Sequence, residues 1–182
     1  MKKNMKNNFS LLLLIVLLLT ACSSEPSLQE YFVTNQEDPN FIVVDIPASI
    51  LKMDQVDLTP TQKEAVSSLR KFNLLAFKVN EDNIEEFSQE QAQVSRILDN
   101  DDFTELMKIN TQYGKGVVKY LGDENAIDEV IVFGHSKDKG FALVRVLGNN
   151  MNPAHLIQLI QAIQKSDYKG NELGEIGKFL KG

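Results

Sequence analysis

Four β-prone runs in the second half of the chain constrain its fold more than any other feature of the sequence. They are 103–109, 117–121, 127–135 and 141–147. The polar connections between them are short and contain glycine, asparagine and aspartate, the residue types that tight turns favour. These short turns between β-prone runs predict an antiparallel meander at the centre of the fold.

Two more strands and a helix precede the meander. The first strand, 41–46, ends at Pro47, which cannot donate to a ladder, and a short helix over 48–53 follows it. The second strand is 74–79. Strand, helix and strand form a candidate crossover, which is right-handed if the two strands are parallel.

Three amphipathic helices are expected to pack on the sheet. The first starts at the capping sequence TPTQ of 59–62, the second runs from an N-cap at Asn80 to Asp99, and the third begins at Asn152. The apolar positions with helical spacing in them are Ala65, Val66, Leu69 and Phe72, then Ile84, Phe87, Val94 and Leu98, then Leu156, Leu159, Ile160 and Ile163. A C-terminal tail carrying Leu173, Ile176, Phe179 and Leu180 has similar spacing but is interrupted by glycines.

The first residues of the chain are typical of an export signal. Lys2, Lys3 and Lys6 precede an apolar run over 9–19. That run is shorter than the roughly 20 residues that a spanning helix needs. Permanent spanning of a membrane is therefore not expected.

The apolar run ends in Leu19-Thr20-Ala21-Cys22, which resembles the lipobox of bacterial lipoproteins. The resemblance implies that Cys22 receives a diacylglyceryl thioether, becomes the new N-terminus and is acylated on its amine. Two or three acyl chains exceed the marginal anchoring that one chain gives. The alternative is an ordinary signal peptide with Cys22, the only cysteine, as an incidental thiol.

The residues after Cys22 bear on where such a lipoprotein goes. Aspartate in the position of Ser23 holds many Gram-negative lipoproteins in the inner membrane, so its absence favours the outer membrane, facing the periplasm. Ser24-Glu25 faintly resembles the acidic signals for the cell surface, which is the alternative. The formal charge of −6 becomes −9 once the three lysines of the signal are removed, which argues against nucleic acid as a partner.

The chain divides into a signal, a tether and one domain. Of its 182 residues, 1–21 form the lipoprotein signal peptide and 22–40 the lipidated cysteine and a polar tether. The remainder, 41–182, is long enough for a single domain with its own core. We expect an α+β domain in the order β-α-β-α-β-β-β-β-α, with a core over 41–165, a tail over 166–182 and a mostly antiparallel sheet.

This order in an exported lipoprotein resembles a family of Gram-negative envelope proteins known as domain of unknown function 4252. The residues that carry the resemblance are FIVVDIP at 41–47, NLLAFKV at 73–79, EVIVFG at 129–134 and GFALVRVLG at 140–148. The family supplies no catalytic residues that could be assigned to positions of this chain.

Candidate catalytic and metal motifs are incomplete. Gly134-His135-Ser136 contains G-x-S, but Asp138 replaces the second glycine of a nucleophile elbow and a strand follows in place of a helix. His135 and His155 lie in no zinc motif. The acidic run from Asp99 has Thr104 where a calcium loop needs glycine. We expect no catalytic residue, no metal and no cofactor beyond the lipid on Cys22.

The last hairpin is apolar on both faces, whereas an antiparallel sheet with one wet face alternates apolar and polar residues. One explanation is a cover from a helix of the same chain or from the C-terminal tail. The other is an exposed patch for a partner or a second copy, formed by Phe133, Phe141 and Leu143 and rimmed by Arg145.

The sequence thus predicts a membrane-anchored envelope lipoprotein with a non-catalytic binding or accessory module. Its partner would be an envelope protein or a second copy of itself. The alternatives are a hydrolase acting on envelope material and a structural spacer.

Overall fold

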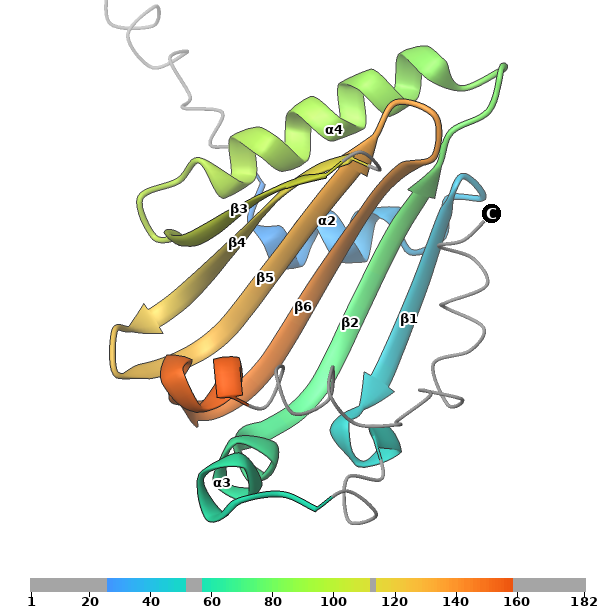
Figure 1. Ribbon diagram of the computed structural model, residues 1–182. Helices are drawn as coiled ribbons and strands as arrows, with labels where there is room; N and C mark the ends of the chain where they lie inside the picture. The colour runs from blue at the N-terminus through green and yellow to red at the C-terminus, as the bar shows by residue number, and fades with distance from the viewer. Residues whose placement is uncertain (1–25, 52–56, 112–113, 159–182) are drawn as a thin grey trace, which may run out of the picture.

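The computed structural model describes residues 26–51, 57–111 and 114–158. A six-stranded, fully antiparallel sheet in the order β1-β2-β6-β5-β4-β3 forms its centre (Figure 1). The strands are β1 (Phe41–Pro47), β2 (Leu69–Lys78), β3 (Thr104–Thr111), β4 (Gly114–Asp123), β5 (Ala126–Ser136) and β6 (Gly140–Met151). The α+β class and the meander of the last four strands are confirmed.

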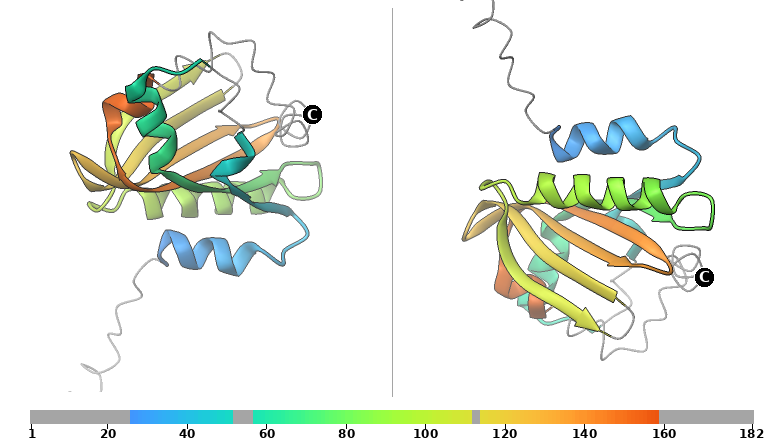
Figure 2. Two further views of the ribbon diagram at one scale, coloured as in Figure 1. Left: turned by 90° about the horizontal axis from the view of Figure 1, so that it is seen from below. Right: turned by 90° about the horizontal axis from the view of Figure 1, so that it is seen from above.

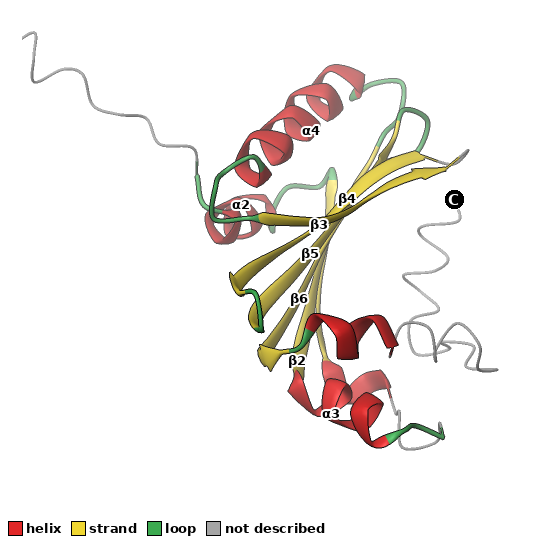
Figure 3. Ribbon diagram, turned by 60° about the vertical axis from the view of Figure 1, so that its left-hand side comes forward, coloured by secondary structure: helices red, strands yellow, loops and turns green. Residues whose placement is uncertain are grey.

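Helices cover both faces of the sheet. α2 (Leu28–Asn35) and α4 (Ile84–Leu98) lie on one face, while α3 (Pro60–Ser68) and a helical segment at 153–158 lie on the other (Figures 2 and 3). A short 3-10 helix, Ala48–Leu51, follows β1. The sheet is therefore the middle of three layers.

The strands β1 and β2 pair directly with each other and are antiparallel. The parallel crossover considered for them is therefore absent. The capping box of α3 is confirmed, with Thr59 and Gln62 each bonding to the backbone of the other. The helix nevertheless ends at Ser68, earlier than predicted, because Leu69 is extended and starts the pairing of β2 with β6.

The helix α4 also begins later than predicted. Its N-cap is Asn83, whose side chain accepts a hydrogen bond from the Asn80 N–H at 2.7 Å, so Asn80 belongs to a turn before the helix. Ile84, expected to face inward, is 57 % exposed because it is the first helical residue. Phe87, Val94 and Leu98 are buried as predicted.

The helix α2 occupies part of the predicted tether. Ser27 and Glu30 form a capping box, and the hydrogen bonds from Ser27 hold the pKa of the Glu30 carboxyl below its usual value. Leu28, Tyr31 and Phe32 are buried against the sheet. The predicted tether is wrong at 28–35, because these residues form a helix that packs on the sheet.

The main core lies between α2, α4 and the sheet. Its centre is a group of phenylalanine rings from four strands and α4, with Phe77 and Phe141 stacked at a centroid distance of 5.7 Å and Phe41 edge-on to Phe77 at 5.0 Å. A smaller cluster on the opposite face includes Ile127 and Met151, with Leu156 packed against it as expected. The predictions for Leu159, Ile160, Ile163 and the C-terminal tail fall outside the described residues.

Candidate functional site

The residues predicted to form a partner patch are buried within the chain. Phe133, Phe141, Leu143 and Arg145 expose between 0 % and 6 % of their surface. The three apolar ones belong to the main core, under α2 and α4. The exposed patch is therefore wrong at these positions, and cover by a helix of the same chain is the explanation that holds for this face.

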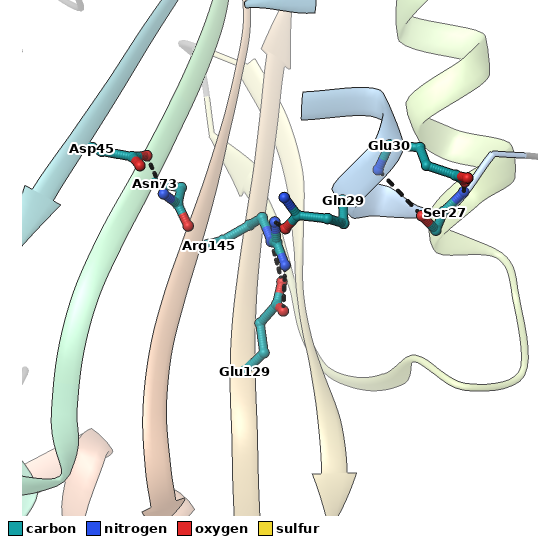
Figure 4. A network of polar contacts seen from close by, with 7 residues as sticks. All are labelled: Ser27, Gln29, Glu30, Asp45, Asn73, Glu129 and Arg145. Carbon is teal, nitrogen blue, oxygen red and sulfur yellow. Dashed lines mark hydrogen bonds and ion pairs between the residues drawn. The ribbon is translucent and has the colours of Figure 1, made fainter. Parts of the chain in front are cut away.

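Arg145 takes part in a buried ion pair instead of a patch rim. Its Nε and Nη2 donate to the two carboxylate oxygens of Glu129 at 2.5 and 2.8 Å (Figure 4). Both side chains are more than nine-tenths buried. Such a two-point pair between neighbouring strands fixes the position of the guanidinium plane.

The helix α2 closes over this ion pair. The Gln29 Oε1 accepts a hydrogen bond from the Arg145 Nη1 at 2.7 Å (Figure 4). The Phe32 ring centroid lies 5.2 Å from the Arg145 guanidinium carbon. A cation held over an aromatic face is attracted by the ring quadrupole. Arg145 therefore connects the sheet to Gln29 and Phe32, two positions three residues apart on one side of α2.

A cavity of about 800 Å³ adjoins Arg145 and Glu129. It lies where the N-terminal end of α2, the C-terminal end of α4 and the strands meet. The polar side chains that line it are Ser27, Gln29, Glu30, Arg96, Asp99, Asn100, Asp102, Glu129 and Arg145. Leu28, Ile97, Phe103 and Leu121 add an apolar part of the wall. Concave sites with converging polar groups are where small ligands bind, and the wall of this cavity is more polar than that of most such pockets.

The C-terminal end of α4 is held in place beside this cavity. Lys119 on β4 donates a hydrogen bond to the Leu98 carbonyl and lies 4.0 Å from the Asp99 carboxylate. A cation is favourable there because the carbonyl end of a helix carries a partial negative charge. Lys119 thus fixes the wall from which Asp99 projects.

A second polar contact joins α2 to α4. The Tyr31 hydroxyl donates to the Glu90 carboxylate at 2.7 Å. Burial, together with this hydrogen bond and the charge of Glu90, raises the pKa of the Tyr31 hydroxyl far above its usual value. This hydrogen bond links α2 to α4 and requires the Tyr31 hydroxyl to keep its proton.

The G-x-S sequence lies at the end of the β5–β6 hairpin. Ser136 pairs with Gly140 across the turn, and its hydroxyl accepts a hydrogen bond from the Asp138 N–H. His135 stacks on Phe133 at a centroid distance of 5.7 Å. Partial burial, and secondarily the nearby charge of Lys115, lower the pKa of His135.

The acidic segment from Asp99 forms the connection between α4 and β3. Asn100 Oδ1 accepts from the Asp102 N–H at 3.0 Å, which shapes this turn. Within 26–51, 57–111 and 114–158, no three His, Cys, Asp or Glu side chains are grouped to hold a metal ion. No helix in that part of the chain is long and apolar enough to cross a membrane.

A family model matches most of the described chain. The model, named Domain of unknown function (DUF4252), covers 31–159, from within α2 through the helical residues 153–158 after β6. The chain belongs to this DUF4252 family. No curated protein and no solved structure matches the chain. The match includes Glu129 and Arg145, so the buried ion pair lies inside the DUF4252 domain.

The sequence analysis missed Glu129 and Gln29 as members of the site. The available signal was one glutamate at the start of the otherwise apolar run EVIVFG, on the same face as an arginine in the next strand. A charge on an apolar strand face needs a partner when buried. The other signal was Ser27 followed three residues later by Glu30, the spacing of a capping box.

Proposed function

We propose that this DUF4252 protein is a lipid-anchored lipoprotein of the cell envelope, held at the outer membrane and facing the periplasm, with a non-catalytic binding domain. The lipobox-like sequence ending at Cys22 supports the anchor. The cavity beside Arg145 supports binding as the role of the domain.

The position at which α2 starts supports the proposal most directly, because it would limit the distance between the domain and a bilayer that holds Cys22. Only residues 23–27 separate Cys22 from Leu28, the first residue of α2. The six Cα–Cα steps from Cys22 to Leu28 span at most about 22 Å when fully extended. An acylated Cys22 would therefore keep the α2 end of the domain, with its cavity, close to the lipid headgroups.

The same anchor would direct the opposite side of the domain away from the membrane. α2, the described helix nearest in sequence to Cys22, lies in one layer with α4, whereas α3 and the 153–158 helix lie on the other face of the sheet (Figure 2). A partner in the periplasm would meet the α3 side first, and a ligand from the bilayer would meet the α2 side first.

Metabolic labelling with an acyl-chain analogue tests the anchor. The unaltered protein is expected to become labelled and to fractionate with membranes, while Cys22→Ala is expected to lose the label and remain as unprocessed precursor. Ser24→Ala serves as the matched control and should be labelled normally. Persistent labelling of Cys22→Ala would rule out Cys22 as the lipidated residue.

Sorting is tested with the residue that follows the cysteine. Ser23→Asp is expected to move the protein from outer-membrane to inner-membrane fractions. Protease added to intact cells distinguishes a periplasmic from a surface-exposed domain, since only the latter is cleaved. Recovery of the unaltered protein in the inner membrane would contradict the proposed location.

A further inference from the structure

The Arg145 guanidinium has more hydrogen-bonding capacity than its neighbours use. An arginine side chain carries five N–H donors. Glu129 and Gln29 accept three hydrogen bonds from Arg145, and no other acceptor for it lies in 26–51, 57–111 or 114–158. Arg145 is only 6 % exposed and lines the cavity, so its two remaining N–H groups call for an oxygen acceptor there.

Carboxylates lie on another part of the cavity wall. Glu30 comes from α2, and Asp99 and Asp102 come from the end of α4 and the turn after it. Asp99 and Asp102 are exposed to solvent, so each can accept hydrogen bonds from a ligand at the mouth. The lining therefore presents a buried donor and acidic acceptors to the same space.

The charge of the lining excludes two simple classes of ligand. Four carboxylates, those of Glu30, Asp99, Asp102 and Glu129, oppose the guanidinium groups of Arg96 and Arg145. The ammonium of Lys119 lies 4.0 Å from Asp99, so the balance is a surplus of one negative charge. A lone anion would reach the N–H groups of Arg145 only against this acidic surplus, and a lone ammonium would leave those N–H groups without an acceptor. A ligand that carries both an anionic oxygen and an ammonium group matches both parts of the wall.

From this lining we infer that the cavity binds a phosphoethanolamine group, with phosphate oxygens on the free N–H groups of Arg145 and the ammonium on Asp99 and Asp102. The choice of a lipid headgroup as its source rests on the proposed function, because the short link from Cys22 to α2 would hold the cavity near the bilayer. An ammonium donates three hydrogen bonds, which a choline group cannot do. Phosphoethanolamine is therefore expected to bind more tightly than phosphocholine.

A titration of the unlipidated mature chain tests this inference without depending on the anchor. The chain from residue 22 onward, with Cys22→Ser, is titrated with soluble glycerophosphoethanolamine while amide resonances are recorded. Shifts are expected for 27–30 and 99–103, with binding about tenfold tighter than that of glycerophosphocholine or glycerol 3-phosphate. Absence of binding, or equal affinity for all three compounds, would overturn the assignment.

Two variants separate the cavity from the rest of the surface. Asp99→Asn combined with Asp102→Asn is expected to weaken glycerophosphoethanolamine about tenfold and to leave glycerol 3-phosphate unchanged or tighter. Asp82→Asn combined with Asp138→Asn removes the same charge from distant exposed turns and should change nothing. Arg145→Lys, which keeps the charge and loses the planar fork, should abolish the preference among the three compounds. Equal effects of the two aspartate pairs would contradict a site in this cavity.

Vesicle flotation then distinguishes a lipid headgroup from a free compound. The same Cys22→Ser chain is expected to float with vesicles of equal parts phosphatidylethanolamine and phosphatidylcholine, but not with phosphatidylcholine alone. Binding of the soluble compound without flotation would assign the site to a free phosphoethanolamine ester and overturn the lipid source. Flotation that survives the Asp99 and Asp102 changes would show surface association and contradict the cavity.

Discussion

The Phe32 ring lies over the Arg145 guanidinium, with 5.2 Å between the ring centroid and the guanidinium carbon. Phe32 is on α2 and Arg145 is near the middle of β6. This contact therefore joins the first described helix to the strand that comes last in the sequence and lies between β2 and β5 in the sheet. Both side chains are buried. The N-terminal helix is therefore part of the folded domain and would transmit any pull from a membrane anchor directly to the sheet.

Truncation of Phe32 should show how strongly α2 is held. Phe32→Ala removes a buried ring from the main core together with its contact to Arg145, and we expect a loss of about 3 to 5 kcal/mol in the free energy of unfolding. Chemical denaturation of the unlipidated chain measures it. Val33→Ala, at an exposed position of the same helix, should change stability by less than about 0.5 kcal/mol. A similar small effect at Phe32 would mean that α2 is not docked in solution.

The first capping box offers a milder test of the same helix. Ser27→Ala removes the side chain that accepts from the Glu30 N–H and is expected to cost about 1 kcal/mol. Thr59→Ala removes the equivalent cap of α3 and is the matched comparison. If α2 opens alone, Ser27→Ala should speed amide hydrogen exchange in 28–35 without affecting 60–68. Uniform acceleration across both helices would argue against local opening.

The buried Tyr31 hydroxyl makes stability depend on alkaline pH. Its pKa is raised in the folded state, so the folded protein keeps the proton at pH values where the unfolded chain has lost it. The stabilisation is fully present below about pH 10, the ordinary pKa of tyrosine, and is lost as the pH rises above it. Melting temperatures between pH 8 and 11 should fall less steeply for Tyr31→Phe than for the unaltered chain. Identical slopes would show that Tyr31 does not contribute.

The strands and the capped helix α3 could be predicted from local patterns, whereas α2 and the site could not. Turn residues and β-prone runs mark the meander because each strand carries its own signal over several residues. Half of the residues of α2 are polar, and its buried side chains are Leu28, Tyr31 and Phe32. Its docking depends on side chains of the sheet more than a hundred residues away, such as Arg145.

The alternation within β5 and β6 correctly separated two apolar faces but did not reveal what covers each. Phe133, Phe141 and Leu143 follow the same period whether a helix or a partner lies over them, because periodicity records only the face of a side chain. The ion pair of Glu129 and Arg145 was hidden for a related reason. The register runs without a break from the Ser136–Gly140 pair to the Glu129–Leu147 pair, so counting from the turn places both charged side chains on one face but does not show that α2 buries them.

The ion pair itself leads to a prediction about coupled substitutions. Arg145→Met alone leaves the Glu129 carboxylate buried without its partner, and Glu129→Leu alone leaves the Arg145 guanidinium buried without its partner. Each single substitution is expected to lower the free energy of unfolding by about 3 to 5 kcal/mol. The double variant removes both charges and should recover most of that loss, because two apolar side chains can pack where the pair was. Chemical denaturation of the two single variants and the double variant gives the coupling energy between the sites. Additive losses in the double variant would show that the two side chains act independently. That result would contradict the claim that Glu129 holds Arg145 in place beneath α2.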